Sequence, residues 1–220
     1  MAREALDLLG PKMTLRPYQQ AAVDAAVEWM RKSLAPACIE AATGAGKSHI
    51  IAEIARQIHH QTSKRVLCLA PSAELVVQNH GKYLASGHRS SMFSASAGAK
   101  ELRYSVVFGS PLTVKNRISA FKRAGADGYA LVVIDEAHGI TPTVQGIVAE
   151  MRQGNPNLRV LGLTATPYRL GSGWIFREDA EGRINGEDTA RDPYFAKCVY
   201  KVGARELIDQ GFLTKPVIGE

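Results

Sequence analysis

The stretch AATGAGKS, at residues 41–48, constrains the fold of this chain more than any other feature of its sequence. It follows the apolar run PACIEA (36–41) and precedes the segment 48–60, in which isoleucines recur at helical spacing. Backbone N–H groups and a helix N-terminus converge on phosphate groups in such a strand–loop–helix arrangement. The stretch therefore predicts a phosphate-binding loop. The alternative is a helix-initiating turn with an exposed lysine.

The residue types of this loop each have a chemical reason. Gly44 and Gly46 permit unusual backbone dihedrals, Lys47 can reach terminal phosphates, and the Ser48 hydroxyl can hold Mg²⁺. Ala41 stands where such loops usually begin with glycine, which is a small departure. The residues predicted to bind the nucleotide phosphates are Thr43, Gly44, Ala45, Gly46, Lys47 and Ser48.

A second motif, LVVIDEAH at residues 131–138, places two carboxylates after a buried apolar run. The carboxyl ends of parallel strands meet at one edge of a sheet, so this run would bring Asp135 and Glu136 beside the loop. Asp135 is predicted to hold Mg²⁺ with Ser48, and Glu136 to orient or deprotonate an attacking water. Two acids that cap a helix are the alternative. Together the motifs predict ATP hydrolysis, with Lys47, Asp135 and Glu136 as catalytic residues.

The apolar runs are continuous rather than alternating, which is typical of strands covered on both faces. Amphipathic helical segments separate them. The fold class predicted is therefore α/β, a mostly parallel sheet with helices on both faces. The expected strands lie at 36–41, 65–71, 105–110, 130–136 and 159–166, and the expected helices at 18–32, 48–60, 73–83, 112–123, 143–151 and 204–210.

Composition narrows the functional classes. The 220 residues carry a formal net charge of +6, which permits a polyanionic partner without requiring one. Cys38, Cys68 and Cys198 are far apart and form no CxxC, so neither a disulfide framework nor a zinc site is expected. A reducing, cytoplasmic setting fits, and no signal peptide or membrane-spanning segment is expected.

Four motifs in order carry a family resemblance: LRPYQQ (15–20), AATGAGKS (41–48), DEAH (135–138) and TATPYR (164–169). They resemble the adenine motif and motifs I, II and III of superfamily 2 helicases, which include DEAD/DEAH-box proteins and helicase-like restriction-enzyme subunits. The resemblance implies a RecA-like P-loop NTPase domain. The run 158–176, followed by CVY and ELIDQGFLTKP, is similar to the RadD-like family of bacterial DNA-repair ATPases.

The resemblance also implies roles around the nucleotide. Gln19 would read the adenine edge, and a solvated first helical turn is the alternative for it. Arg16 and Tyr18 would flank the base. Two threonine hydroxyls and one histidine would couple the γ-phosphate to domain movement. For His138, an ordinary surface histidine is the alternative. The coupling residues implied are His138, Thr164 and Thr166.

Two further segments, APSAELVVQN (70–79) and GSPLTVKNR (109–117), resemble nucleic-acid-contacting motifs. Such contacts hold the phosphodiester backbone without reading sequence. A helix N-cap followed by a solvated basic face is the alternative. DNA, single-stranded or branched, is the expected track, and RNA stays open. The implied contacts are Pro71, Ser72, Gln78 or its neighbour Asn79, Gly109, Ser110, Thr113, Lys115 and Arg117.

The expected organisation has four parts. They are an N-terminal helical segment with the adenine motif (1–34), the motor domain (35–167), an irregular insertion or hairpin (168–203), and an exit segment (204–220). The exit is expected to lead to a second RecA-like domain that supplies an arginine finger. The 220 residues alone are therefore expected to turn over ATP slowly and to separate no strands.

Three other functions are weighed against a repair helicase or translocase. The first is the motor piece of a restriction-enzyme translocating subunit, which a nuclease module elsewhere in the protein would favour. The second is a nucleotide-gated nucleic-acid-binding module, although a pure binder does not need Glu136. The third is a P-loop kinase, which leaves the TATPYR and GSPLTVKNR segments unexplained.

Overall fold

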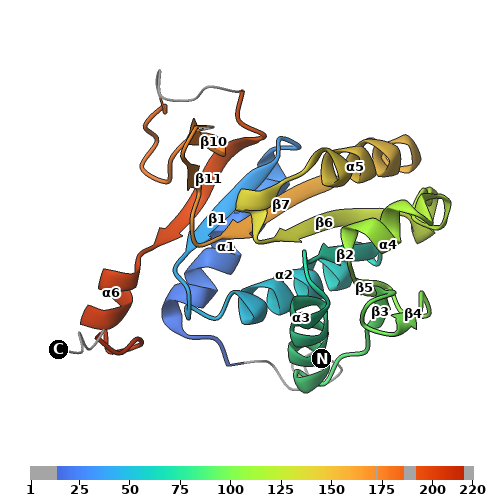
Figure 1. Ribbon diagram of the computed structural model, residues 1–220, viewed down its shortest axis with the longest axis horizontal. Coiled ribbons are helices and arrows are strands. Elements are labelled where there is room, and N and C mark those ends of the chain that lie inside the picture. Colours follow the sequence, from blue (N-terminus) through green and yellow to red (C-terminus); the bar gives the residue numbers. More distant parts are fainter. Residues whose placement is uncertain (1–13, 172, 186–191, 216–220) are drawn as a thin grey trace, which may run out of the picture.

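The computed structural model describes residues 14–171, 173–185 and 192–215. A sheet crosses the centre of the molecule and helices lie on its two faces (Figure 1). The strands expected from the sequence are all present, four with slightly shorter bounds and β6 shifted by one residue: β1 (Ala37–Ala41), β2 (Arg65–Leu69), β5 (Val106–Gly109), β6 (Tyr129–Asp135) and β7 (Arg159–Thr164). Neighbouring strands among these five pair in parallel.

The sheet is wider than the sequence analysis expected. In the described part of the chain it has nine strands in the order β10-β11-β1-β7-β6-β2-β5-β3-β4, with β3 and β4 as its antiparallel pair. A separate small hairpin pairs β8 with β9. The strands not foreseen are β3 (Ser91–Ser94), β4 (Ala99–Lys100), β8 (Tyr168–Arg169), β9 (Gly173–Trp174), β10 (Phe176–Glu178) and β11 (Phe195–Val202).

The description of 168–203 as an irregular insertion or hairpin is therefore wrong for β11. This strand pairs in parallel with β1 and is a full member of the main sheet. Its sequence, FAKCVYKV, shows no strict alternation: Phe195 and Cys198 pack into the core on one face of the sheet, whereas Val202 packs into the core on the other face. Parts of the expected segments fall on residues 1–13, 172, 186–191 and 216–220, which lie outside the described residues.

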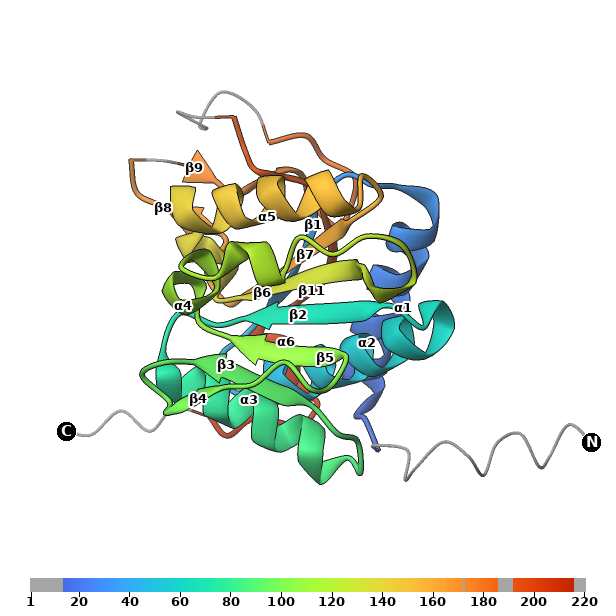
Figure 2. The same ribbon diagram turned by 90° about the vertical axis from the view of Figure 1, so that its right-hand side faces the viewer.

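The helices form two layers, as Figures 1 and 2 show. The first layer lies on one face of the sheet and the second, with α5, on the other. The first holds α1 (Pro17–Lys32), α2 (Lys47–Thr62) and α3 (Ala73–Ala85); the second holds α4 (Pro111–Lys115) and α5 (Pro142–Gly154). A short α6 (Ala204–Asp209) follows β11, and Gly211, just beyond its end, has a φ of +76°.

The helix expected over 112–123 is much shorter in the structure. After α4 the chain continues as a short 3₁₀ turn, Ile118–Ala120. Phe121 is 1% exposed, and its ring lies 5.2 Å from that of Phe93 and 5.7 Å from that of Tyr129. The chain therefore leaves the helix to bury this ring, which helical periodicity alone does not reveal.

Side-chain alternation along the strands creates the two cores. In β6, Leu131 and Val133 pack toward α1–α3, whereas Val132 and Ile134 pack toward α4 and α5. Both faces are thus apolar, as the continuous apolar runs indicated. This confirms the prediction of an α/β fold with a mostly parallel sheet and helices on both faces. Within the described ranges no helix is long and apolar enough to cross a bilayer.

The sheet leaves no room for a side chain at Gly162 in β7. A Cβ there would lie 2.6 Å from Ala137 Cβ and 2.6 Å from the Phe195 ring. We expect Gly162→Ala to destabilise the fold by about 1–3 kcal/mol, since overpacking displaces neighbouring side chains and backbone. Urea unfolding of the purified chain measures the change.

Gly146 provides the matched control, because it lies within α5 and a Cβ there meets nothing within 4 Å. Gly146→Ala should stabilise the chain by up to about 1 kcal/mol, since alanine restricts the unfolded chain and favours helix. Equal stability of the two variants would contradict the packing described around Gly162.

Candidate functional site

The predicted phosphate loop joins β1 to α2. Gly44 and Gly46 adopt φ of +82° and +77°, in the left-handed region that favours glycine. Gly46 is also the N-cap of α2 and makes no side-chain cap, so the helix N-terminus is left open to a ligand. A Cβ at Gly46 would lie 2.5 Å from Gln19 Nε2. Both the backbone conformation and the close packing therefore require glycine here.

A chain of polar contacts leaves this loop along the edge of the sheet. Lys47 Nζ lies 3.5 Å from Glu136 Oε1, and Glu136 Oε2 lies 3.2 Å from His138 Nδ1. His138 Nδ1 is also 3.1 Å from Thr164 Oγ1, which accepts a hydrogen bond from the Thr166 N–H. Residues from motifs I, II and III are thus brought together, as the sequence predicted for neighbouring strand ends.

Asp135 and Glu136 occupy an unusual turn. Asp135 ends β6 and is 6% exposed, while Glu136 adopts φ 50° and ψ 49°, which is strained for a residue with a side chain. The Glu136 N–H donates to Asp135 Oδ1 at 2.9 Å. Burial raises the pKa of the Asp135 carboxyl, and its hydrogen bonds from Asn79 and the Glu136 N–H oppose that rise. The strain keeps both carboxylates at the sheet edge.

Helix α3 supplies two contacts to this site that differ from the expectation. Gln78 Nε2 donates to Ser48 Oγ at 3.0 Å, and Asn79 Nδ2 donates to Asp135 Oδ2 at 2.8 Å. In this structure both amides are therefore engaged at the predicted ATP site, and a contact of Gln78 or Asn79 with nucleic acid stays a prediction. The two residues lie about 9 Å along the helix axis from Ser72, which brings them over the phosphate loop.

The adenine-motif residues are packed onto the same loop. Gln19 Nε2 donates to the Ala45 carbonyl at 2.9 Å, and Tyr18 Oη donates to the same oxygen at 3.0 Å. Gln19 Oε1 accepts from the Arg16 N–H at 3.0 Å. One amide hydrogen of Gln19 remains for a base. Tyr18 is 4% exposed, so its ring lies in the core rather than along an open base pocket.

Two residues beside the adenine motif were missed by the sequence analysis. The Phe212 ring lies 5.1 Å from that of Tyr18 and 5.2 Å from the Arg16 guanidinium. Leu213 Cδ2 would lie 2.9 Å from a Cβ at Gly44. Both belong to the segment GFLTKP, which was interpreted only as an exit from the domain. The one sequence signal was its pair of large apolar residues after a helix-ending glycine.

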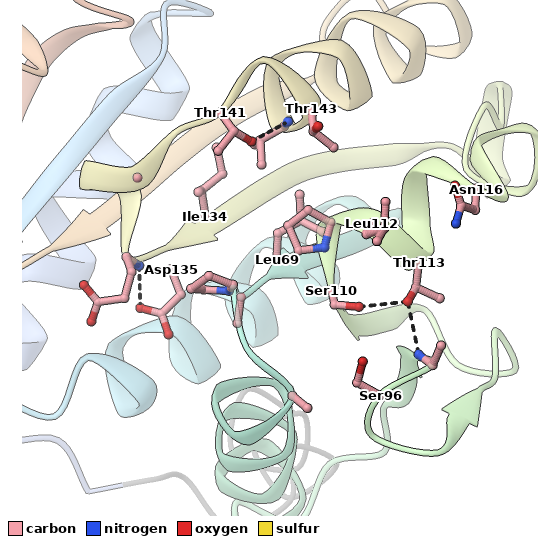
Figure 3. A pocket seen from close by; sticks show the side chains of 18 of the residues that line it. Leu69, Ser96, Ser110, Leu112, Thr113, Asn116, Ile134, Asp135, Thr141 and Thr143 are labelled. Carbon is pink, nitrogen blue, oxygen red and sulfur yellow. Dashed lines mark hydrogen bonds between the residues drawn. The ribbon is translucent and has the colours of Figure 1, made fainter.

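A pocket of about 540 Å³ opens at the carboxyl ends of β2, β5 and β6 (Figure 3). It brings Pro71, Ser110 and Thr113 to the same hollow as the DEAH turn. Thr113 Oγ1 accepts hydrogen bonds from the Ser110 hydroxyl at 2.9 Å and from the Ala95 N–H at 3.1 Å. The pocket is therefore a preformed surface that joins the predicted nucleic-acid segments to the predicted catalytic residues.

The remaining predicted nucleic-acid contacts divide into two groups. Lys115 and Arg117 are exposed, and so is Ser72, which caps α3 by accepting from the Leu75 N–H at 3.2 Å. Gly109 is buried, and a Cβ there would lie 3.0 Å from Val114 and 3.1 Å from the Phe93 carbonyl. Close packing therefore requires glycine at position 109, and its contact with a phosphate stays a prediction.

The donor set fits Mg²⁺ bound together with phosphates. Mg²⁺ prefers oxygen ligands and usually keeps one or two carboxylates plus substrate phosphates and waters. Ser48 Oγ and the Asp135 carboxylate are hard oxygen donors on adjoining elements, joined through α3. Among the described residues, no group of three or more His, Cys, Asp or Glu side chains could hold a metal alone.

Comparison with known proteins agrees with this arrangement. The family described as the type III restriction enzyme, res subunit, matches residues 12–169. The chain is 31% identical over 140 residues to the genome polyprotein of classical swine fever virus (strain Alfort/Tuebingen). The aligned region covers 59% of this chain and 3% of the polyprotein. The chain thus spans a small part of that curated relative.

Two solved structures are similar in fold. The first is a nuclease-deletion mutant of the Type ISP restriction-modification enzyme LlaGI in complex with a DNA substrate mimic; the TM-score is 0.63 and the identity 16%, over 90% of this chain and 21% of that one. The second is the UvsW helicase from bacteriophage T4; the TM-score is 0.58 and the identity 20%, over 75% of this chain and 59% of that one. With residues 12–169 matched, this chain belongs to the family of the type III restriction enzyme res subunit and has the RecA-like fold of a superfamily 2 helicase motor domain.

Proposed function

We propose that this chain binds and hydrolyses ATP with Mg²⁺ and couples that hydrolysis to movement along DNA. The observation that carries the proposal is the continuous contact chain from Lys47 through Glu136 and His138 to Thr164, at 3.5, 3.2 and 3.1 Å. This series of contacts begins at the phosphate loop. Glu136 and His138, in its middle, line the pocket that the predicted nucleic-acid segments also line.

The Lys47–Glu136 ion pair defines the resting state of the site. When ATP binds, the Lys47 ammonium turns to its phosphates and the Glu136 carboxylate is released. Glu136 then accepts the proton of the water that attacks the γ-phosphorus, as the bond to the ADP oxygen breaks. Ser48 and Asp135 would hold Mg²⁺, which would supply neutralisation of phosphate charge.

The base lies against the segment that packs on the adenine motif. The exposed Arg16 guanidinium and the Phe212 ring face each other at 5.2 Å and are the flat surfaces beside the phosphate loop. Gln19 is fixed by two hydrogen bonds and offers its second amide hydrogen to the adenine edge. Phe212 thus takes the flanking role that the sequence analysis gave to Tyr18.

The nucleic-acid strand follows the pocket at the strand ends. Ser72 and Ser110 offer hydroxyl donors to its phosphates, Pro71 lines the path beside them, and Lys115 and Arg117 add positive charge. Backbone contacts of this type bind without sequence preference. DNA is the proposed track, with RNA as the alternative, and a second RecA-like domain in the same protein is the proposed moving partner.

The biological setting proposed first is DNA repair or recombination, because residues 158–176 and 206–216 resemble the RadD-like family. Residue 216 lies outside the described residues. The second candidate is a restriction-enzyme translocating subunit. The family match over residues 12–169 and the fold likeness to the LlaGI enzyme favour it. A nuclease module in the protein that carries this chain would decide for restriction.

Two substitutions separate nucleotide binding from hydrolysis. Lys47→Ala should weaken ATP binding at least about tenfold, since the phosphates lose their charged partner. Glu136→Gln should bind ATP normally but hydrolyse it about 10²- to 10⁴-fold more slowly, because the proton acceptor is lost. Isothermal calorimetry measures the first effect and phosphate release the second.

Glu150→Gln is the matched control, because Glu150 is a surface acid whose partner is Lys122. It should leave both binding and turnover unchanged. Normal turnover by Glu136→Gln would remove the role assigned to that residue.

Phe212→Ala tests the base pocket. Loss of one stacking surface should raise the KM for ATP about tenfold or more, since stacking on an aromatic ring contributes about 1–3 kcal/mol per base. Competition by inorganic tripolyphosphate, which has no base, should stay the same. Phe212→Tyr should retain the wild-type KM, and an equal loss of tripolyphosphate binding would place Phe212 outside the base pocket.

Substitution of Lys115 and Arg117 tests whether a nucleic-acid strand contacts these two residues. Replacing both with glutamine should weaken binding of single-stranded DNA and reduce the slope of log K against log salt by about 1 per contact removed. The matched control replaces Lys64 and Lys82, which are exposed or partly exposed cations outside the pocket. An unchanged slope in the first variant would exclude phosphate contacts by these two residues.

A further inference from the structure

Helix α3 connects the two halves of the proposed site through consecutive residues. We infer that Gln78 and Asn79 are positioning residues for Ser48 and Asp135, and that through them α3 links nucleic acid at its N-terminus to Mg²⁺ at the ATP site. This inference rests on the proposed function and gives a role at the ATP site to two residues that the sequence motifs offered only as alternative nucleic-acid contacts.

Gln78 fixes the Ser48 hydroxyl. Its side-chain N–H donates to Ser48 Oγ at 3.0 Å, across the gap between α3 and the first turn of α2. A hydroxyl has two lone pairs and one proton, so this bond occupies one lone pair and leaves the other for a metal ion. Gln78 is otherwise exposed, and it holds no part of the core. Its amide is therefore directed at the candidate ligand rather than used for folding.

Asn79 fixes the second candidate ligand. It is 1% exposed, and its Nδ2 donates to Asp135 Oδ2 at 2.8 Å, while the Glu136 N–H holds Asp135 Oδ1 at 2.9 Å. Both carboxylate oxygens therefore have a fixed donor. Asn79 Oδ1 is buried and has no hydrogen-bond partner within the described part of the chain, which is costly for a polar atom. A residue chosen for packing alone would be apolar here.

The other end of α3 faces the predicted nucleic-acid track. Ser72 is its N-cap, Pro71 and Ser72 are exposed, and Pro71 and Ala73 line the pocket of Figure 3. A continuous helix of hydrogen-bonded turns moves as one body. A shift of α3 caused by a strand at Ser72 therefore reaches the amides of Gln78 and Asn79, less than two helical turns away.

The first test measures the metal requirement of nucleotide binding. A fluorescent ADP analogue is titrated onto the chain at increasing Mg²⁺, and again in chelator without metal. Gln78→Met should raise the Mg²⁺ concentration for half-maximal enhancement about tenfold, because outer-shell partners of metal ligands typically contribute 10- to 100-fold in metal affinity. Binding without metal should not change, since the phosphate loop is intact.

Gln61→Met is the matched control, because Gln61 is an exposed glutamine at the far end of α2. It should behave as wild type. Gln78→Asn, whose amide is one methylene shorter, should fall between Met and wild type. An unchanged Mg²⁺ requirement in Gln78→Met, or an equal loss of metal-free binding, would overturn the positioning role.

Asn79→Leu provides a second variant at the buried position. It should raise the Mg²⁺ requirement as Gln78→Met does, and its melting temperature shows whether it folds. If it does not fold, the Gln78 series alone decides. A folded Asn79→Leu with wild-type Mg²⁺ dependence would limit the proposal to Gln78 and contradict the role of Asn79.

The second test measures coupling. The affinity for the ADP analogue with Mg²⁺ is compared with and without saturating single-stranded oligothymidine. The wild-type chain should show a difference of about fivefold or more, within the usual range of allosteric coupling, and Gln78→Met should lose most of it. No difference in the wild type, or an equal difference in both, would overturn the link through α3. Failure of the wild type to bind nucleotide at all would instead contradict the proposed function.

Discussion

The ion pair between Lys47 and Glu136 is the interaction that joins the phosphate loop to the DEAH turn in the candidate site. Its two partners come from different strand ends, β1 and β6, and β7 lies between those strands. Only a parallel sheet with both faces covered brings their loops to one edge. Lys47 and Glu136 neutralise each other there. A bound phosphate would replace Glu136 as the ionic partner of Lys47. Phosphate binding at the loop would therefore change the ionic contact of Glu136.

The parts of the site that could be predicted from sequence are those built by local chemistry. Gly44 and Gly46 are needed for positive φ, and Lys47 follows directly at the start of a helix. Asp135 ends a continuous apolar run that could only be a buried strand. Each of these signals lies within about ten residues, so hydrophobic period and turn chemistry suffice to find it.

The parts that escaped prediction depend on contacts between distant segments. β11 shows neither a continuous apolar run nor strict alternation, because two lysines interrupt it, although it joins β1 in the sheet. Gln78 lies 30 residues from Ser48 and Asn79 lies 56 from Asp135, so no local pattern connects them. Phe212 meets Arg16 across 196 residues. Helical phase after Ser72 indicates which residues share a face of α3, but not which element that face meets.

We propose that this domain couples ATP hydrolysis to movement along DNA. The direct test is to measure ATP turnover with and without nucleic acid. The protein that carries this chain is assayed with single-stranded DNA, single-stranded RNA and duplex DNA at constant salt. Turnover should rise severalfold with DNA, since Glu136 lines the same pocket as the predicted nucleic-acid segments. Turnover that is indifferent to every nucleic acid would contradict it.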